Sequence, residues 1–433
     1  MPDRRIGRRA FLATGAAGAA VVGAACSPAP PPPPITVGGD GPYGPLGAPD
    51  ANGIQLPAGF TAREVARAGA TVAGTSYAWH KFSDGGACFA TGDGGWIYVS
   101  NSEAFVDGGA SALRFSSAGN VTSAYRILSG TVANCAGGAT PWGTWLSCEE
   151  HPFGRVWECS PTGASAAVAR PAMGVFQHEA VAVDPTKKKL YLTEDQPDGR
   201  LYRFSPFSYP DLAAGFLEVA VVAADGSVTW AAISDPGGTT TPTRQQVPSS
   251  RGFNGGEGIV WNRGMVFFAT KGDDKVWAYN TNTSKLSVHY DGRAQPSLPL
   301  HGVDNIGVSP FNELLVCEDH GNMEIVVLGT DGSSAPLLRV IGQDDSELAG
   351  VAFNPAGTRL YVSSQRGGPA KRGVIYEVSG PFAQRGVIAT EAPAGASVLP
   401  PVAVGPGAAL VLVAAGRLWR LRTRPREHDA GAG

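Results

Sequence analysis

The sequence predicts an all-β fold, a β-propeller with six blades, and three observations support this prediction. Short apolar runs typical of β-strands each end in an abrupt polar tip, and they recur as IYVSNSE (97–103), WLSCEE (145–150), LYLTED (190–195), VFFATKGD (266–273), LLVCED (314–319) and LYVSSQ (360–365). A second short run follows each of them, which predicts six hairpins. The tips are 47, 45, 78, 46 and 46 residues apart, a near-constant period typical of propeller blades.

The remaining elements complete a four-stranded unit. A further strand precedes most hairpins, at residues 179–185, 257–262, 304–310 and 347–355. The one long interval predicts an insertion within residues 207–252, where a run of threonines marks a loop. Residues 401–421 form a last unit without acids, which is either a seventh blade or part of the blade closure. A pair of β-sandwiches is the alternative fold, but it would not require a constant period.

Composition excludes several classes of protein. Glycine (59) and proline (34) are frequent, as expected for a folded chain rich in turns. Charged residues make up only 16% and the net charge is −3, so the chain has no basic surface for nucleic acid. Hydrophobic residues make up 43%, enough for a large core, yet no apolar run reaches the ~18 residues that span a bilayer.

The first 26 residues have the pattern of a twin-arginine export signal. Arg8 and Arg9 precede a soft apolar stretch (13–25) that ends at Cys26. A basic helix of the fold is the alternative, but alanine and glycine would give it a weak packing face. We expect residues 27–41 to be a Pro/Gly-rich linker, 42–425 a single propeller domain and 426–433 a tail. The protein is then periplasmic or extracellular, its partner is the twin-arginine export machinery, and a lipid on Cys26 would be its only membrane anchor.

Acidic residues recur in step with the repeat. In a propeller, the loop into the innermost strand and the tip after the second strand emerge on one face, so their side chains meet at one mouth of the channel. The acids fall in these loops and tips: Asp84, Glu179, Glu257, Asp304 and Glu347 in the loops, and Glu103, Glu149, Glu150, Glu194, Asp195, Asp273, Asp274, Glu318 and Asp319 at the tips. The offsets from loop acid to tip are 19, 16, 16, 15 and 18 residues.

Carboxylates at such close quarters favour bound cations, because like charges oppose ionisation. Oxygen ligands suit calcium, whereas a thiolate suits a softer or redox-active metal such as iron. Cys148, beside two glutamates, is the expected thiolate ligand, and Cys317 is its equivalent in register. We interpret Cys88, Cys135 and Cys159 as packing or disulfide residues. A single acid after a strand is usually a turn residue, so the prediction rests on the whole set.

Specific segments resemble the PhoX family of bacterial alkaline phosphatases. The resemblance is carried by TPWGTWLSCEE (140–150), DGGWIYVSNSE (93–103), FQHEAVAVD followed by LYLTED, GGEGIVW around Glu257, VDNIGVSP around Asn305 and ELAGVAFNPAGTRLYVSSQ (347–365). It covers roughly residues 84–368. The resemblance implies an exported propeller with iron and calcium ions at the channel mouth, acting on phosphate monoesters with a cysteine and several glutamates as ligands.

The resemblance also implies roles for individual residues. Cys148, Glu179 and Glu257 are the expected catalytic residues, and His178, Asn305 and Arg366 are expected to contact the substrate. The expected metal ligands are Cys148, Glu149, Glu150, Glu179, Glu194, Asp195, Glu257, Glu318 and Asp319. One position departs from the family: Gly255 stands where PhoX phosphatases have an arginine, so Arg251, Lys271 or Arg366 would have to bind phosphate instead.

Together, these observations predict an exported, metal-dependent phosphatase with iron and calcium as cofactors and small phosphorylated substrates. Two alternatives remain. One is a propeller hydrolase that acts on a lactone or a phosphotriester, which the glycine at position 255 favours. The other is a non-catalytic surface protein whose loops are braced by calcium ions.

Overall fold

A computed structural model describes residues 41–294, 300–329 and 333–383 of the chain. All of them belong to one compact unit, Met1–Ile388. The predicted export signal, most of the linker, the acid-free unit at 401–421 and the tail lie outside the described residues. Among those described, no helix is both long enough and apolar enough to cross a membrane.

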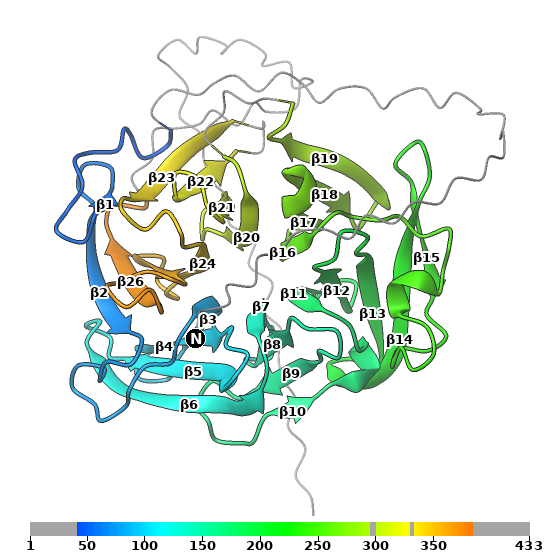
Figure 1. The fold of residues 1–433 in the computed structure, drawn as a ribbon, viewed down its shortest axis with the longest axis horizontal. Coiled ribbons are helices and arrows are strands. Elements are labelled where there is room, and N and C mark those ends of the chain that lie inside the picture. Colours follow the sequence, from blue (N-terminus) through cyan, green and yellow to red (C-terminus); the bar gives the residue numbers. More distant parts are fainter. Residues whose placement is uncertain (1–40, 295–299, 330–332, 384–433) are drawn as a thin grey trace, which may run out of the picture. The chain divides into compact units, whose positions relative to one another are not determined.

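Six antiparallel sheets form the blades of a β-propeller, which confirms the predicted fold (Figure 1). Blades one and two have four strands each: β3 (Ser83–Ala90), β4 (Trp96–Ser102), β5 (Gly108–Phe115) and β6 (Val121–Thr131), then β7 (Asn134–Ala139), β8 (Trp145–Glu149), β9 (Val156–Cys159) and β10 (Val168–Ala169). Blade three has five: β11 (His178–Asp184), β12 (Lys189–Glu194), β13 (Leu201–Ser208), β14 (Asp211–Val222) and β15 (Val228–Ala232).

The other three blades follow the same plan. Blade four contains β16 (Gly256–Asn262), β17 (Met265–Thr270), β18 (Lys275–Asn280) and β19 (Lys285–Asp291). Blade five contains β20 (Val303–Val308), β21 (Leu314–Glu318), β22 (Glu324–Leu328), β23 (Ser334–Val340) and the short β1 (Ile54–Gln55). Blade six contains β24 (Leu348–Phe353), β25 (Arg359–Ser364), β26 (Val374–Ser379) and β2 (Thr61–Arg67).

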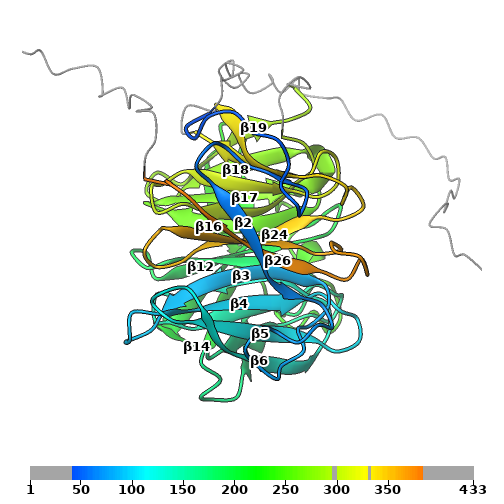
Figure 2. The same ribbon diagram turned by 90° about the vertical axis from the view of Figure 1, so that its left-hand side faces the viewer.

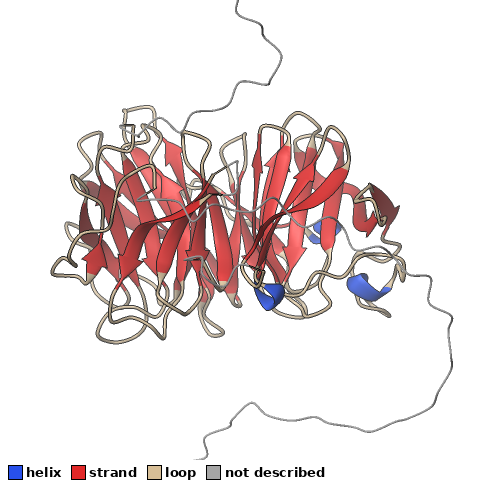
Figure 3. Cartoon of the chain, turned by 90° about the horizontal axis from the view of Figure 1, so that it is seen from above, coloured by secondary structure: helices blue, strands red, loops and turns tan. Residues whose placement is uncertain are grey.

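Helical structure in the described residues is limited to three short 3₁₀ turns (Figure 3). They are η1 (Pro171–Met173), η2 (Thr243–Gln245) and η3 (Lys271–Asp273). The predicted insertion at 207–252 contains the long strand β14, the extra strand β15 and η2. The insertion therefore widens blade three and adds no separate domain to it.

The core lies mainly between neighbouring blades. The second and third strands of each blade are largely buried, because the neighbouring blades cover both faces of each sheet. The stacked rings of Tyr98 and Tyr361, with centroids 4.8 Å apart, illustrate this packing where blade one meets blade six. Each blade thus depends on its neighbours to bury its apolar residues.

An N-terminal strand closes the circle. β2 pairs antiparallel with β26, from Thr61 opposite Ser379 to Arg67 opposite Val374, and lies along its edge (Figure 2). Glu377 of β26, almost fully buried, accepts hydrogen bonds from Arg63 of β2 at 2.9 and 3.1 Å. Closure in the described residues therefore comes from residues 61–67, which the sequence analysis had not assigned.

The innermost strands approach one another very closely. A Cβ atom on Gly138 of β7 would lie 1.9 Å from the carbonyl oxygen of Val181 in β11, so only glycine fits there. One on Gly258 of β16 would lie 2.5 Å from the backbone nitrogen of Ile306 in β20. These contacts narrow the central channel to a cavity of about 260 Å³, lined largely by glycine, alanine and valine.

Candidate functional site

The innermost strands begin with an irregularity that turns one side chain toward the channel. In the first five blades this residue lies in a register shift, where a β-bulge re-aims side chains. The five residues are Asp84, Cys135, Glu179, Glu257 and Asp304. Glu347 has the matching position in blade six, directly before β24.

Strand pairing brings a second side chain beside each of these. The residue before the bulge pairs with the last residue of the second strand, as Ser83 does with Ser102 and Val303 with Glu318. The next residue on each strand then leaves the sheet together with its partner. In blade six, the backbone of Gln365 likewise donates to the Glu347 carbonyl at 3.0 Å.

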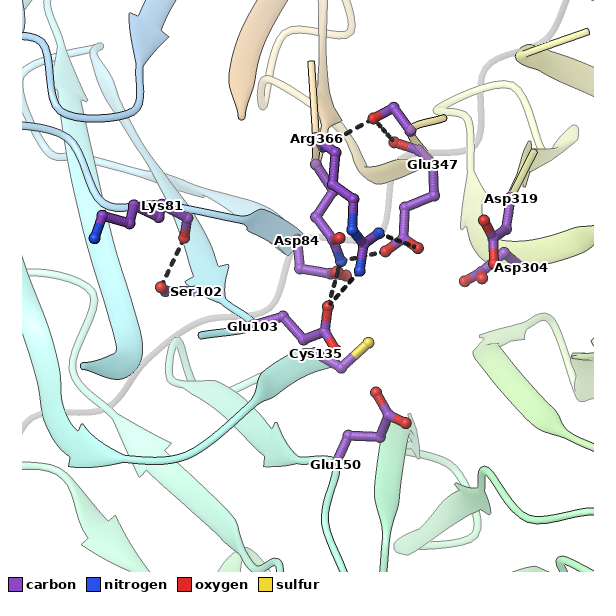
Figure 4. Close-up of polar contacts among 12 residues, drawn as sticks. Lys81, Asp84, Ser102, Glu103, Cys135, Glu150, Asp304, Asp319, Glu347 and Arg366 are labelled. Atoms are coloured by element: carbon purple, nitrogen blue, oxygen red, sulfur yellow. Dashed lines mark hydrogen bonds and ion pairs between the residues drawn. The ribbon is translucent and has the colours of Figure 1, made fainter. Parts of the chain in front are cut away.

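Two side chains from every blade therefore meet at one mouth of the channel, and we call this set the channel-mouth ring. Its members, blade by blade, are Asp84 and Glu103, Cys135 and Glu150, Glu179 and Asp195, Glu257 and Lys271, Asp304 and Asp319, and Glu347 and Gln365. All members except Asp84 and Gln365 line a cavity of about 490 Å³. Figure 4 shows several of these side chains pointing toward one another.

Potential ligand atoms in the ring come close enough to share cations. Four groups of three residues each have ligand atoms within 4.8 Å of one another: Cys135, Glu150 and Glu179; Asp84, Glu103 and Glu347; Glu179, Glu257 and Asp304; and Asp304, Asp319 and Glu347. Because the groups share members, they form a continuous chain of potential ligands around the channel mouth.

Side chains of the protein itself, Lys271 and Gln365, already contact several carboxylates of the ring. Lys271 Nζ lies 3.0 Å from both Glu257 Oε1 and Asp304 Oδ2, and 3.1 Å from Asp319 Oδ2. On another side, the Gln365 amide donates to Asp84 at 2.5 Å, to Glu103 at 2.6 Å and to Glu347.

The group with the cysteine has no cation of its own among the described residues. Cys135 Sγ donates to Glu179 Oε1 at 3.1 Å, and the Gln177 amide donates to Glu150 at 2.9 Å. Glu179 is 1% exposed, and its Oε2 has no hydrogen-bond partner. A buried carboxylate oxygen without a partner is costly, so this corner has unused capacity for a positive ion.

Burial makes the ring resist ionisation. It raises the pKa of Glu103 to about 7, with added repulsion from Asp84. Burial also raises the pKa of Asp304 to about 6, although Lys271 opposes the rise. The pKa values of four more glutamates are raised for the same first reason, burial: Glu150, Glu179, Glu257 and Glu347. Added cations would let these acids ionise together.

The structure places the expected thiolate ligand elsewhere. Cys148 is fully buried in an apolar cluster with Leu146, Val156 and Phe176, away from the ring. It lies two residues before Glu150, still inside strand β8, so its side chain packs between blades. Cys317 is buried in the same way. The cysteine of the ring is Cys135, and all five cysteines in the described residues are free thiols.

Two hairpin tips carry a pair of adjacent acids, Glu149–Glu150 and Glu318–Asp319, and the first acid of each pair was expected to bind metal but does not reach the ring. Glu149 accepts hydrogen bonds from the backbones of Val132 and Arg155, both at 3.1 Å. Glu318 accepts from the backbones of His301 and Glu324 in the same way. These acids end the second strand and bind their own blade, so they brace hairpins, and only the following residue reaches the ring.

Two further tips behave similarly. Glu194 accepts a hydrogen bond from the Tyr202 hydroxyl at 2.8 Å and lies 3.4 Å from Arg244. Asp274, expected at the fourth tip, contacts His301 at 3.0 Å. At that tip the ring residue is Lys271, which comes directly after β17.

The three expected substrate contacts lie in different places. His178 is buried, its ring is stacked on Phe176 at 3.6 Å, and its Nε2 lies 3.1 Å from the Gly174 carbonyl oxygen. Asn305 lines the narrow channel below the ring. Arg366 does line the cavity, where it lies 3.2 Å from Glu347 and 3.7 Å from Glu103.

Five of the expected metal ligands do meet at the ring: Glu150, Glu179, Asp195, Glu257 and Asp319. The sequence analysis therefore found part of the ring and missed the rest. Cys135 was expected to be a packing or disulfide residue, but it is a free thiol in the ring. Its position carried a signal, since it lies 15 residues before Glu150 and the other blades show offsets of 15 to 19.

Residues 98–296 match the family described as alkaline phosphatase PhoX. The match covers a little under half of the chain, so it shows that this part is similar to PhoX sequences. The resemblance found in the sequence is therefore confirmed. The PhoX of Pseudomonas fluorescens, solved in complex with vanadate, a transition-state analogue, has 16% sequence identity and a TM-score of 0.64. The match covers 78% of this chain and 97% of that PhoX, and at this identity it shows the shared fold.

Two further solved structures match less closely. A gluconolactonase from Xanthomonas campestris shares 13% identity with a TM-score of 0.44, over 78% of this chain and 99% of that one. A Bacteroides thetaiotaomicron protein of unknown function shares 10% identity with a TM-score of 0.48, over 74% and 76%. No curated protein matches the chain.

Gly255 has a backbone conformation that accounts for the glycine at this position. Its φ of +68° is a left-handed conformation that favours glycine, and a Cβ there would lie 3.2 Å from the Gly272 nitrogen. Of the three replacements considered, Lys271 and Arg366 line the cavity. Arg251 instead stacks on the Trp277 ring at 4.6 Å.

Proposed function

We propose that this protein is a metal-dependent phosphatase that hydrolyses phosphate monoesters in the cavity above the channel-mouth ring. The observation that carries the proposal is the convergence of side chains from all six blades on one buried, acid-rich ring, in a chain whose residues 98–296 match PhoX. The solved PhoX with the same fold holds vanadate, a mimic of the phosphoryl group in transfer. A hydrolase that acts on phosphate is the function that fits both findings.

The residues of the ring fit cations of two kinds. Cys135, Glu150 and Glu179 offer one sulfur and carboxylate oxygens, a set that suits iron. Asp84, Glu103 and Glu347 offer oxygen alone, a set that suits calcium. The unpartnered Oε2 of buried Glu179 is the direct structural sign that a positive ion fits this ring. Such cations, when bound, supply Lewis-acid stabilisation of charge on phosphoryl oxygens.

Arg366 orients the substrate in this proposal. Its side chain lines the cavity and is 41% exposed, whereas the Lys271 ammonium, which also lines the cavity, already lies within 3.1 Å of three carboxylates. The guanidinium of Arg366 presents a planar fork of N–H donors that matches two phosphate oxygens. Arg366 thus supplies the phosphate contact that Gly255 lacks.

A substrate panel tests the proposal. Purified, metal-loaded protein is expected to hydrolyse p-nitrophenyl phosphate and to lose that activity in a chelator, while a lactone and a phosphotriester are not cleaved. Arg366→Ala is expected to raise KM at least tenfold, because a charge-assisted contact with the substrate is lost. The matched variant Arg251→Ala, outside the cavity, keeps the wild-type KM. Cleavage of the lactone or the triester in place of the monoester would contradict the proposal.

We infer from the sequence that the protein is exported through the twin-arginine pathway. Replacing Arg8 and Arg9 by lysine is expected to keep the protein in the cytoplasm, and cell fractionation measures this. Metabolic labelling with a fatty acid tests lipid attachment, which Cys26→Ala is expected to abolish.

A further inference from the structure

Lys271 differs from every other member of the channel-mouth ring because it carries a positive charge. The equivalent tip residues in the other blades are Glu103, Glu150, Asp195, Asp319 and Gln365. Its position is set by the backbone, since it begins the short turn η3 directly after β17. The side chain therefore enters the ring at a place where most other blades supply a carboxylate.

The Lys271 ammonium sits at the centre of one corner of the ring. It donates hydrogen bonds to Asp304 at 3.0 Å and to Asp319 at 3.1 Å, and it lies 3.0 Å from Glu257. Two of the three ammonium hydrogens are thereby donated, and Glu257 Oε1, which has no hydrogen-bond partner among the described residues, faces the ammonium as an ion pair. All three acids are almost fully buried, with side chains 2%, 7% and 8% exposed for Glu257, Asp304 and Asp319.

The four candidate ligand groups divide according to this contact. Both groups that contain Asp304 are reached by Lys271, whereas the other two groups, around Cys135 and around Asp84, are not. A metal ion bound by Asp304 together with Glu257 or Asp319 would lie within a few ångströms of Nζ. Two positive charges at that distance in a buried site repel strongly.

We propose that Lys271 is the resident cation of the corner formed by Glu257, Asp304 and Asp319, so that this corner holds an ammonium in place of a metal ion. Metal binding is then confined to the groups around Cys135 and Asp84. The inference rests on the part of the proposed function in which the ring binds cations, and it does not depend on the substrate. Because the ammonium is covalently tethered, chelators leave this share of the ring's positive charge in place.

The proposal predicts that removing the charge creates a metal site. Lys271→Met keeps the length of the side chain and loses its charge, so the freed carboxylates are expected to bind one additional Ca²⁺ per chain. Lys271→Arg, which keeps the charge, is expected to bind the wild-type number. Lys275→Met is the matched control, because Lys275 pairs with Asp273 at 2.9 Å outside the ring.

Equilibrium dialysis with Ca²⁺, followed by elemental analysis, measures the number of ions per folded chain, with folding checked by circular dichroism. A gain of one ion in Lys271→Met alone supports the proposal. An unchanged number in folded Lys271→Met, or an equal gain in Lys275→Met, overturns it.

A second measurement uses the wild-type protein and needs no variant to fold. Crystals soaked in Mn²⁺ are expected to show anomalous peaks beside Cys135 or Asp84 and none in contact with Asp304. A peak in contact with Glu257, Asp304 and Asp319 overturns the proposal. Absence of phosphatase activity would refute the proposed function, yet it would leave these ion counts interpretable.

Discussion

Replacing two buried cysteines by alanine, one at a time, tests which of them is a metal ligand and which is a core residue. Cys135→Ala removes the only thiol among the four candidate ligand groups, together with the hydrogen bond that Sγ donates to Glu179 at 3.1 Å. Cys148→Ala removes a thiol that is buried in the apolar cluster between blades two and three. We expect the first variant to lose iron and the second to keep it.

The magnitudes follow from the two surroundings. Loss of a residue that merely supports a metal ligand weakens metal binding by about 10–100-fold. Loss of Cys135, which is itself a candidate ligand, is therefore expected to weaken iron binding by at least ~100-fold. Loss of the Cys148 sulfur resembles deletion of one buried methyl group, about 1 kcal/mol of unfolding free energy, with little effect on the ring.

Competition with a chromogenic iron chelator measures the first effect, and urea unfolding measures the second. Wild-type protein loaded under the same conditions is the reference for both variants. If Cys148→Ala loses iron while Cys135→Ala retains it, or if the two variants bind iron equally, the assignment of the ring thiol is refuted.

Three further predictions concern stability. Burial lowers the pKa of His80 well below its usual 6.5, so only the unfolded chain takes up a proton as the pH falls below 6.5, and stability falls with it. Wild-type protein should therefore lose unfolding free energy between pH 7 and pH 5, at about 1.4 kcal/mol per pH unit below 6.5. His80→Asn should lose roughly 2 kcal/mol less over the same range. An equal loss in both proteins would contradict this reasoning. Glu377→Ala should cost about 3 kcal/mol in urea unfolding, because it removes the ion-pair partner of Arg63 and Arg359 and the acceptor of the Tyr361 hydroxyl. A cost under ~0.5 kcal/mol would show that the Glu377 carboxylate does not hold the closure. Gly138→Ala should cost about 1–3 kcal/mol, because the added Cβ would overlap the Val181 carbonyl, and wild-type thermal stability would refute that close approach.

The repeat period predicted the blades and most of the ring, because both follow from spacing along the chain. Asp84, Glu179 and Asp304 reach the channel mouth as the offsets required. Spacing alone does not reveal the bulge at the start of each inner strand. The bulge in β7 directs Cys135 into the ring, whereas Cys148 lies inside the regular strand β8 and packs in the core. Glu150 reaches the ring because it directly follows the end of β8.

Other features were beyond the reach of pattern reasoning. The ring position of Cys135 became visible only through its register, because its residue type differs from the acids in the other blades. The pairing of residues 61–67 with β26 joins segments more than three hundred residues apart, and no local pattern encodes such a contact.

The pairing of β2 with β26, which we call the clasp, has a consequence for how the protein matures. The ribosome makes the first of these strands early and the second near the end of the described region, so the circle stays open through almost all of synthesis. Glu347 and Gln365 belong to the blade that this clasp completes. The complete ring thus exists only once translation has passed β26, so the ions of the proposed metal centre would bind only after the last described strand has been made.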